Sequence, residues 1–166
     1  QIHRALKPDG LFLAAMLGGE TLNELGEALR DAEIEIEGGL SPRLSPFAEI
    51  KDAGNLLGRA GFALPVADTE TITVSYGNPL KLMTDLRGMG ETNSNMHRRT
   101  TFSRRATLMR AAEIYARKFM NDEGRMPATF EIIYLTAWVP HESQQKPLSP
   151  GSGQVSLGNV FMDDAL

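Results

Sequence analysis

The chain has 166 residues, of which 42% are hydrophobic and 23% charged, enough for one globular domain with its own core but not for two ordinary ones. A net charge of −4 argues against a general nucleic-acid binder, and the absence of cysteine excludes disulfides, thiolate metal sites and cysteine nucleophiles. No apolar run approaches the roughly 18 residues of a membrane span.

The pattern first predicts a buried strand over residues 11–17. Seven apolar residues without polar alternation lie between a Pro- and Gly-containing turn at 7–10 and the pair Gly18-Gly19. Such a run is typical of a strand covered on both faces in an α/β sheet, although a buried helical segment is the alternative. Residues 2–6 resemble the last turn of a helix. Since the chain opens on Gln1, we expect a fragment cut inside an element.

Two helices are predicted next. Residues Thr21–Glu24 have the spacing of a capping box, so a helix is expected to begin at Thr21 and to end at Gly38-Gly39. Its outer face carries acidic residues that we expect to face solvent: Glu24, Glu27, Asp31 and Glu35. Ser45-Pro46 then predicts the start of a second helix, which ends at Gly61.

Two regions have the alternation and composition of strands. Period-two alternation predicts strands near Ala63–Val66 and Thr71–Tyr76, or one long bent strand across both. The segment Thr129–Val139 is rich in β-branched and aromatic residues and predicts the strongest strand of the chain.

The segment between these strands is predicted to hold two helices and a loop. Asn78-Pro79 predicts a helix start whose apolar stripe continues to Gly88, and residues 91–101 are polar and predict a loop. Ser103 is expected to cap the second helix, which extends to Phe119. The resulting order of strands and helices predicts an α/β fold whose three or four strands form only half a sheet.

The sequence contains few motifs that carry chemistry. The histidines are far apart in sequence, and no Walker loop, G-x-S-x-G or strand-linked G-x-G-x-x-G occurs, so we predict no metal site. Gly18-Gly19 follows the first strand, where open α/β sheets place ligands. These glycines allow either a close approach to a ligand or a tight turn. The loop at 87–93 either lines a pocket with polar groups or is a helix C-cap with an exposed turn.

A basic cluster follows that loop and comprises His97, Arg98, Arg99, Arg104 and Arg105. It has the charge to bind an acidic substrate, a phosphopantetheine carrier or RNA. Little aromatic interleaving accompanies the charge, so we interpret the cluster as a solvated helix start.

The L-K-P-D-G-x-F sequence before the first strand resembles the fifth-strand motif of class I S-adenosylmethionine-dependent methyltransferases. Further blocks resemble the branch related to the biotin-synthesis methyltransferase, and most of all the complex I assembly factors of methyltransferase fold found in mitochondria and bacterial relatives. These blocks lie at residues 18–25, 37–47, 56–62, 85–93, 127–130, 141–144 and 151–158.

The resemblance implies the C-terminal half of a Rossmann-like sheet of strand order 3-2-1-4-5-7-6 with the last strand antiparallel. Residues 11–17, 63–76 and 129–139 map to strands five, six and seven. Residues 1–140 form this portion of the domain, with a helical cap insertion at about 78–128, and residues 141–166 form an extended or partly disordered tail.

The resemblance also implies that most of the S-adenosylmethionine site lies upstream of Gln1. Only substrate-side and cap-side candidates can therefore be named: Met16, Gly18, Gly19, Gly90, Glu91, Thr92 and Asn93. No residue is assigned as a general base.

The implied function is that of an S-adenosylmethionine-dependent enzyme whose isolated fragment is inactive. One branch implies hydroxylation of an arginine on a complex I subunit, and the other implies methyl transfer to the carboxylate of a malonyl acyl carrier protein. A non-catalytic assembly or binding module is the alternative. The expected location is the bacterial cytoplasm or the mitochondrial matrix, without nucleic-acid partners or a membrane span.

The open edge of the strand at 11–17 generates a prediction, because the missing fourth strand would normally pair with it. We expect this chain to dimerise, swap or otherwise associate. Light scattering at micromolar concentration tests this, and a strictly monomeric species would contradict it.

Overall fold

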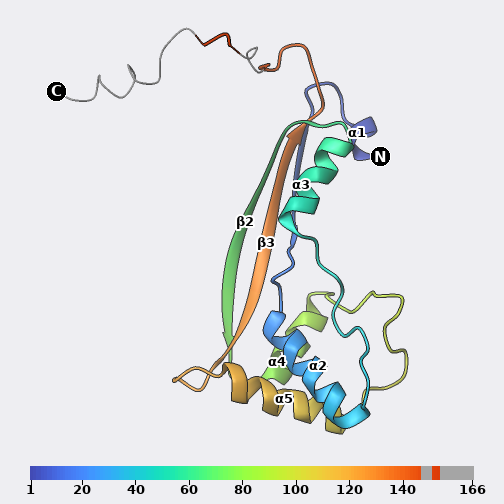
Figure 1. The fold of residues 1–166 in the computed structure, drawn as a ribbon, viewed down its shortest axis with the longest axis vertical. Helices are drawn as coiled ribbons and strands as arrows, with labels where there is room; N and C mark the ends of the chain where they lie inside the picture. The colour runs from blue at the N-terminus through green and yellow to red at the C-terminus, as the bar shows by residue number, and fades with distance from the viewer. Residues whose placement is uncertain (147–150, 154–166) are drawn as a thin grey trace, which may run out of the picture.

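The computed structural model describes residues 1–146 and 151–153. A long sheet has helices gathered at both of its ends (Figure 1). The elements in chain order are α1 (Ile2–Ala5), β1 (Leu11–Leu17), α2 (Asn23–Glu37), α3 (Ile50–Arg59), β2 (Ala63–Tyr76), α4 (Pro79–Gly88), α5 (Arg105–Phe119) and β3 (Met126–Trp138).

The sheet has three strands in the order β1-β3-β2, and β3 runs antiparallel to both neighbours. This confirms the expected arrangement, in which the last strand of the chain lies between the fifth and sixth strands of the methyltransferase sheet. The β2 region forms one strand with a register shift between Ala63 and Val66, as the bent-strand alternative expected. The other long edge of β1 is free of strand pairing within the described residues.

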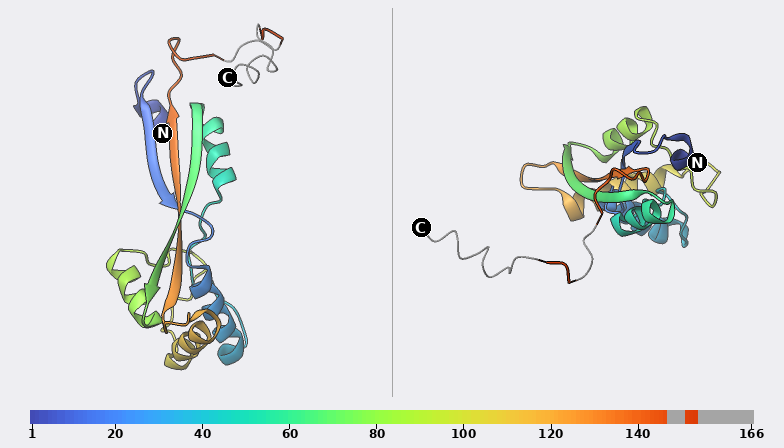
Figure 2. Two further views of the ribbon diagram at one scale, coloured as in Figure 1. Left: turned by 90° about the vertical axis from the view of Figure 1, so that its left-hand side faces the viewer. Right: turned by 90° about the horizontal axis from the view of Figure 1, so that it is seen from above.

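The two halves of β3 bury opposite faces. Near its start, the even-numbered Met126 and Ala128 are buried against α2, α4 and α5, whereas Ile133 and Leu135 further along are buried against α3. Because side chains alternate along a strand, these two groups point to opposite sides of the sheet. The side view in Figure 2 shows the strongly twisted strands that connect the two helical ends.

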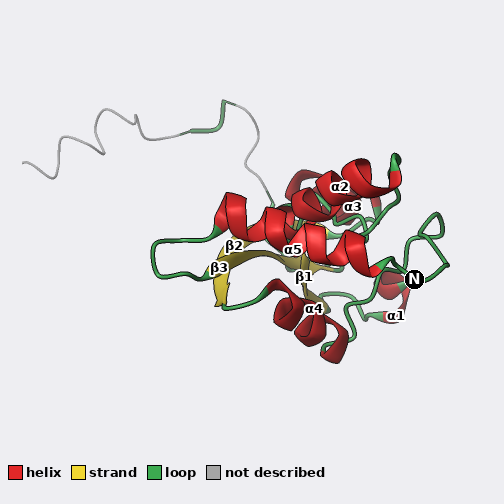
Figure 3. Cartoon of the chain, turned by 90° about the horizontal axis from the view of Figure 1, so that it is seen from below, coloured by secondary structure: helices red, strands yellow, loops and turns green. Residues whose placement is uncertain are grey.

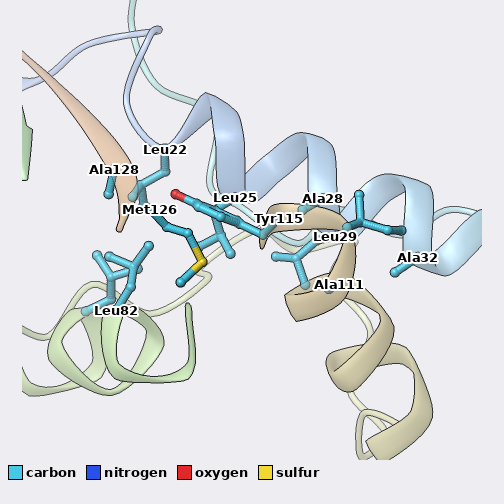
Figure 4. Packing of buried hydrophobic residues seen from close by; sticks show 12 residues of the cluster. Leu22, Leu25, Ala28, Leu29, Ala32, Leu82, Ala111, Tyr115, Met126 and Ala128 are labelled. Carbon is cyan, nitrogen blue, oxygen red and sulfur yellow. The ribbon is translucent and has the colours of Figure 1, made fainter. Parts of the chain in front are cut away.

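The larger core lies where α2, α4 and α5 meet the start of β3. Figure 4 shows Tyr115 between the apolar side chains of α2 and β3, with Leu82 of α4 facing the same cluster. The Tyr115 ring is 1% exposed, and its hydroxyl donates to the carbonyl oxygen of Pro127. Burial raises the pKa of Tyr115 above its ordinary value, so the phenol stays neutral.

The smaller core lies between α3 and the other end of the sheet. Ala53 and Leu57 of α3 pack on Leu135 and Ala137 of β3. The opposite face of the same strands carries exposed apolar side chains, among them Leu13 of β1, which is 69% exposed. The smaller core is therefore covered on one face only, and the prediction that residues 11–17 are covered on both faces is wrong for the described part of the chain.

The predicted capping box at Thr21–Glu24 is wrong, because both side chains bind β3 instead. The Thr21 hydroxyl donates to the carbonyl oxygen of Glu131 and accepts from its N–H, both at 3.1 Å. The Glu24 carboxylate accepts the N–H of Thr129 at 3.2 Å and its hydroxyl at 2.5 Å. Helix α2 consequently begins at Asn23, after Leu22 in left-handed conformation, with no side-chain cap.

Two further predicted helix starts are also wrong. The chain stays extended after Ser45-Pro46, where Ala48 bridges to Gly18, and α3 begins only at Ile50. Ser103 does not cap α5, because its hydroxyl oxygen accepts from the Arg43 guanidinium at 2.7 Å. In both places the serine hydroxyl binds a residue far away in sequence instead of capping the helix that was predicted to follow it.

Several predicted boundaries are confirmed. Asn78 caps α4 by accepting the Leu80 N–H at 2.7 Å, and α4 ends at Gly88 as expected. Gly38 and Gly61 follow helices with positive φ. The segment at 91–101 is irregular.

The expected extended tail begins with a hydrogen-bonded turn at 141–144, and the Gln144 amide donates to Asp9 and Val139. Residues 147–150 and 154–166 of that tail lie outside the described residues. Within the described part of the chain, the helices are too short or too polar to cross a membrane.

The contact between α2 and β3 gives a stability prediction. Removing the Glu24 carboxylate leaves the Thr129 N–H and hydroxyl without their acceptor, so Glu24→Ala is expected to lower the free energy of unfolding by about 1–3 kcal/mol. Urea unfolding measures this change. Glu123→Ala, at an exposed turn, serves as the control and should stay within about 0.5 kcal/mol of wild type. Equal effects of the two substitutions would contradict the assigned role of Glu24.

Candidate functional site

A crevice of about 320 Å³ opens between α2, α4, the start of α5 and two loops. Its floor is apolar, and its rim carries arginines and the polar residues of the loop after α4. An adjoining cavity of about 50 Å³ extends it towards Leu17 at the end of β1. Six residues line both spaces: Arg43, Leu44, Leu86, Glu91, Thr92 and Asn93.

Helix α4 ends in a Schellman turn that brings Glu91 to this crevice. Gly90 has φ +84°, its N–H donates to the Arg87 carbonyl at 3.1 Å, and the Glu91 N–H donates to the Leu86 carbonyl at 2.9 Å. Gly90 itself lines neither space. The two alternatives for this loop therefore both hold, because it is a helix C-cap that also lines a pocket.

The loop after Glu91 is fastened to the segment between α2 and α3. The Asn93 amide donates to the Pro42 carbonyl at 2.7 Å, and the Ser94 N–H donates to the Ser45 hydroxyl at 3.1 Å. Thr92 directly precedes these two anchors and lines the crevice. The structure thus brings Glu91, Thr92 and Asn93 together in one wall.

The candidates at the end of β1 lie elsewhere. A methyl group on Gly18 would collide with the carboxylate of Glu131, and one on Gly19 would collide with the carboxylate of Glu49. The close approach that these glycines permit is therefore to two carboxylates of the fold. Met16 pairs with Ile133 and lines neither space.

Two carboxylates of α2 hold the arginines on the other wall. Arg43 contacts Glu33 through Nε at 2.8 Å and Nη2 at 2.5 Å. Burial alone would raise the pKa of Glu33, but hydrogen bonds from Ser41 and Arg43 together hold it below its ordinary value.

Glu37 joins the start of α5 to the loop before it. Its carboxylate accepts from the Thr107 hydroxyl at 2.7 Å and from the Arg99 guanidinium. These two hydrogen bonds hold the pKa of Glu37 below its ordinary value of 4.5, and the hydrogen bond from Thr107 has the larger effect on the pKa. We call these two carboxylates and their two arginines the Glu33–Glu37 cluster.

The outer face of α2 is not simply solvated, as the sequence predicted. Figure 3 shows α5 alongside α2, and the contacts run in opposite chain directions, because Glu35 meets Arg110 while Glu27 and Asp31 meet Lys118. The Lys118 ammonium lies 2.6 Å from both carboxylates and lowers the pKa of Asp31. The acidic face of α2 is thus a docking surface for α5.

The basic cluster divides into two parts. Arg98 and Arg99 line the crevice, whereas Arg104 and Arg105 are exposed and His97 lines neither space. The solvated interpretation therefore fails for Arg99, which pairs with Glu37. Arg43 was not predicted as a site residue, and its only sequence signal is a lone cation in a Pro- and Ser-rich segment.

Among residues 1–146 and 151–153, no group of three or more His, Asp or Glu side chains is placed so that it could hold a metal ion.

Curated relatives match nearly the whole chain. The mitochondrial arginine-hydroxylase NDUFAF5 of Danio rerio is 47% identical over 160 residues, covering 96% of this chain and 50% of that protein, and the Homo sapiens protein is 48% identical over the same length. A malonyl-[acyl-carrier protein] O-methyltransferase of Laribacter hongkongensis is 36% identical over 91% of this chain and 48% of that protein. The chain spans about half the length of these relatives. No protein-family model matches it.

The Glu33–Glu37 cluster predicts a loss of stability in acid. Since the pKa of Glu37 is lower in the folded than in the unfolded chain, its contribution is complete above the ordinary value of 4.5 and is lost as the pH falls through the folded value. The urea midpoint is therefore expected to fall between about pH 5 and about pH 3, and to fall less in Glu37→Gln.

Glu123→Gln is the matched control for that experiment, because this exposed glutamate has no ion pair within the described residues. It should keep the full pH dependence of wild type. An identical acid response in Glu37→Gln and wild type would show that Glu37 does not contribute.

Proposed function

We propose that the full-length product of this chain's gene modifies an arginine side chain of a protein in an S-adenosylmethionine-dependent reaction. The chain belongs to the family of methyltransferase-fold proteins that includes these arginine hydroxylases and O-methyltransferases. The observation that carries this proposal is the 47–48% identity to the arginine hydroxylases over 96% of the chain. The identity to the O-methyltransferase is 36%.

In this proposal the chain supplies the substrate side of the active site. The crevice has an apolar floor that includes Leu25, Leu29 and Leu108, which suits the aliphatic part of a long side chain and its neighbours. Its polar rim, with Glu91 and Asn93, suits the charged or hydrogen-bonding end. Fixing a substrate in one orientation accounts for a large part of enzymatic rate enhancement.

We propose that the adenosyl cofactor binds outside this chain. The glycines at the end of β1 lie against the carboxylates of Glu131 and Glu49 rather than beside an open cradle. We therefore assign cofactor binding to the part of the full-length protein that corresponds to the rest of the relatives' length. No reaction step is assigned to residues of this chain beyond holding and orienting the substrate.

Carboxylate methylation of a malonyl carrier protein is a second candidate, and one feature of the crevice favours it. Four arginines line the larger space, namely Arg43, Arg87, Arg98 and Arg99, against the single acidic residue Glu91. Arginine binds carboxylates and phosphates bidentately, as a malonyl thioester on a phosphopantetheine arm would require.

The proposed cellular location depends on which of the two candidate activities the full-length protein has. An arginine hydroxylase would act in the mitochondrial matrix or in the cytoplasm of a bacterium, and a carrier-protein methyltransferase would act in the bacterial cytoplasm.

Calorimetric titration of S-adenosylmethionine into the full-length protein and into this chain is the first test. We expect binding to the full-length protein only. Binding to neither would favour a non-catalytic assembly module, particularly if partner binding survives blockage of the cofactor pocket. Binding to this chain alone would contradict the assignment of its strands to the C-terminal half of the sheet.

Product mass then separates the two chemistries. The full-length protein and S-adenosylmethionine are incubated in aerated buffer containing a chemical reductant, once with an arginine peptide and once with a malonyl carrier protein. One oxygen atom of dioxygen should enter a C–H bond of the arginine side chain, the reductant supplying two electrons so that the other oxygen atom leaves as water, and the peptide should gain the mass of one oxygen atom. Addition of one methylene mass to the carrier protein would establish the second candidate instead.

A further inference from the structure

We infer that Glu91 is the residue that selects a guanidinium group in the crevice. This inference rests on the proposed arginine substrate and adds the side chain that would recognise it. Glu91 is a specificity residue in this account and takes no part in the chemical step.

The backbone places Glu91 with little freedom. The Schellman turn fixes its N–H on the Leu86 carbonyl, and the left-handed Gly90 sets the direction in which the chain leaves α4. The residue at this position of the motif is frequently apolar and packs back on the helix. A carboxylate at this position gives no such packing, and Glu91 is exposed where it lines the crevice.

The charge of Glu91 is not used within the described fold. The other carboxylates near the crevice, those of Glu33 and Glu37, are bound to Arg43 and Arg99. Glu91 is the only acidic residue that lines either space, and in the described residues its carboxylate makes no hydrogen bond or ion pair. It is therefore available to a ligand.

The other charged side chains that line the crevice are arginines, so binding of a cationic substrate depends on the carboxylate of Glu91. Arg43 and Arg99 are compensated by their partners, but Arg87 and Arg98 have no carboxylate partner in the described part of the chain. A guanidinium that entered the crevice would meet like charge from these two side chains. Only Glu91 offers the planar pair of oxygens that a guanidinium binds bidentately.

The test measures binding of two peptides to the full-length protein loaded with S-adenosylmethionine. One is a five-residue acetylated peptide amide with a central arginine between leucines, chosen to suit the apolar floor, and the other carries citrulline at the centre. Citrulline has nearly the shape of arginine and no charge. Calorimetry is run with wild type, Glu91→Gln, Glu91→Asp and the control Glu142→Gln, which lies at the other end of the sheet.

Wild type and Glu142→Gln should bind the arginine peptide about tenfold more tightly than the citrulline peptide. Glu91→Gln should lose this preference, and Glu91→Asp should retain part of it. Urea unfolding of each variant shows whether a loss reflects the fold, since Glu91→Gln removes no contact described within the fold and should match wild type.

The outcomes distinguish a failure of the role assigned to Glu91 from a failure of the proposed function. A preference for arginine that persists in Glu91→Gln overturns the role of Glu91 and leaves the proposed function standing. Absence of binding and of any mass change for the arginine peptide in wild type overturns the proposed function, and the role of Glu91 with it. Tighter binding of a malonyl thioester than of the arginine peptide, lost in Arg98→Gln and kept in Glu91→Gln, also overturns both the proposed function and the role of Glu91.

Discussion

Every packed layer of this fold depends on β3 (Met126–Trp138), which pairs with a strand on each edge and buries opposite faces at its two ends. The β1 and β2 strands do not pair with each other, and α2 is bound to β3 through the side chains of Thr21 and Glu24. The last strand of the chain therefore organises elements that precede it. The sheet has a high proportion of non-local contacts as a result, which is typical of slow-folding topologies.

The crevice is a product of charge compensation. The carboxylates on one helix, α2, bind cations from the segment after it, from the loop after α4 and from α5. Surface ion pairs are individually weak, but pairs that share partners between the same two helices define a register. Helices α4 and α5 and the loop between them are thus positioned by charge as well as by the apolar cluster around Tyr115. The turn that positions Glu91, in contrast, is closed by backbone hydrogen bonds.

Local rules predicted the elements of this chain better than their ends. The strands, the cap at Asn78 and the glycines at 38 and 61 were predictable because their signals act within a few residues. The caps expected at Thr21, Ser45 and Ser103 failed because residues 49 to 110 positions away in sequence bind those hydroxyls. For the same reason the sequence could name Glu91, Thr92 and Asn93 as candidates, since they are neighbours on one loop, whereas the position of Arg43 beside them appears only in the structure.

The opposite orientation of the two cores has a consequence for local opening. Because α3 packs on one face of β3 and α2, α4 and α5 pack on the other, the side chains at the two ends belong to two separate cores. Such an arrangement favours separate cooperative units, each with its own opening free energy. Release of α4 and α5 from α2 would expose the crevice while the hydrogen-bonded ladder beside α3 stays protected from exchange. The crevice would then open through partial unfolding of one unit rather than through the movement of a hinge.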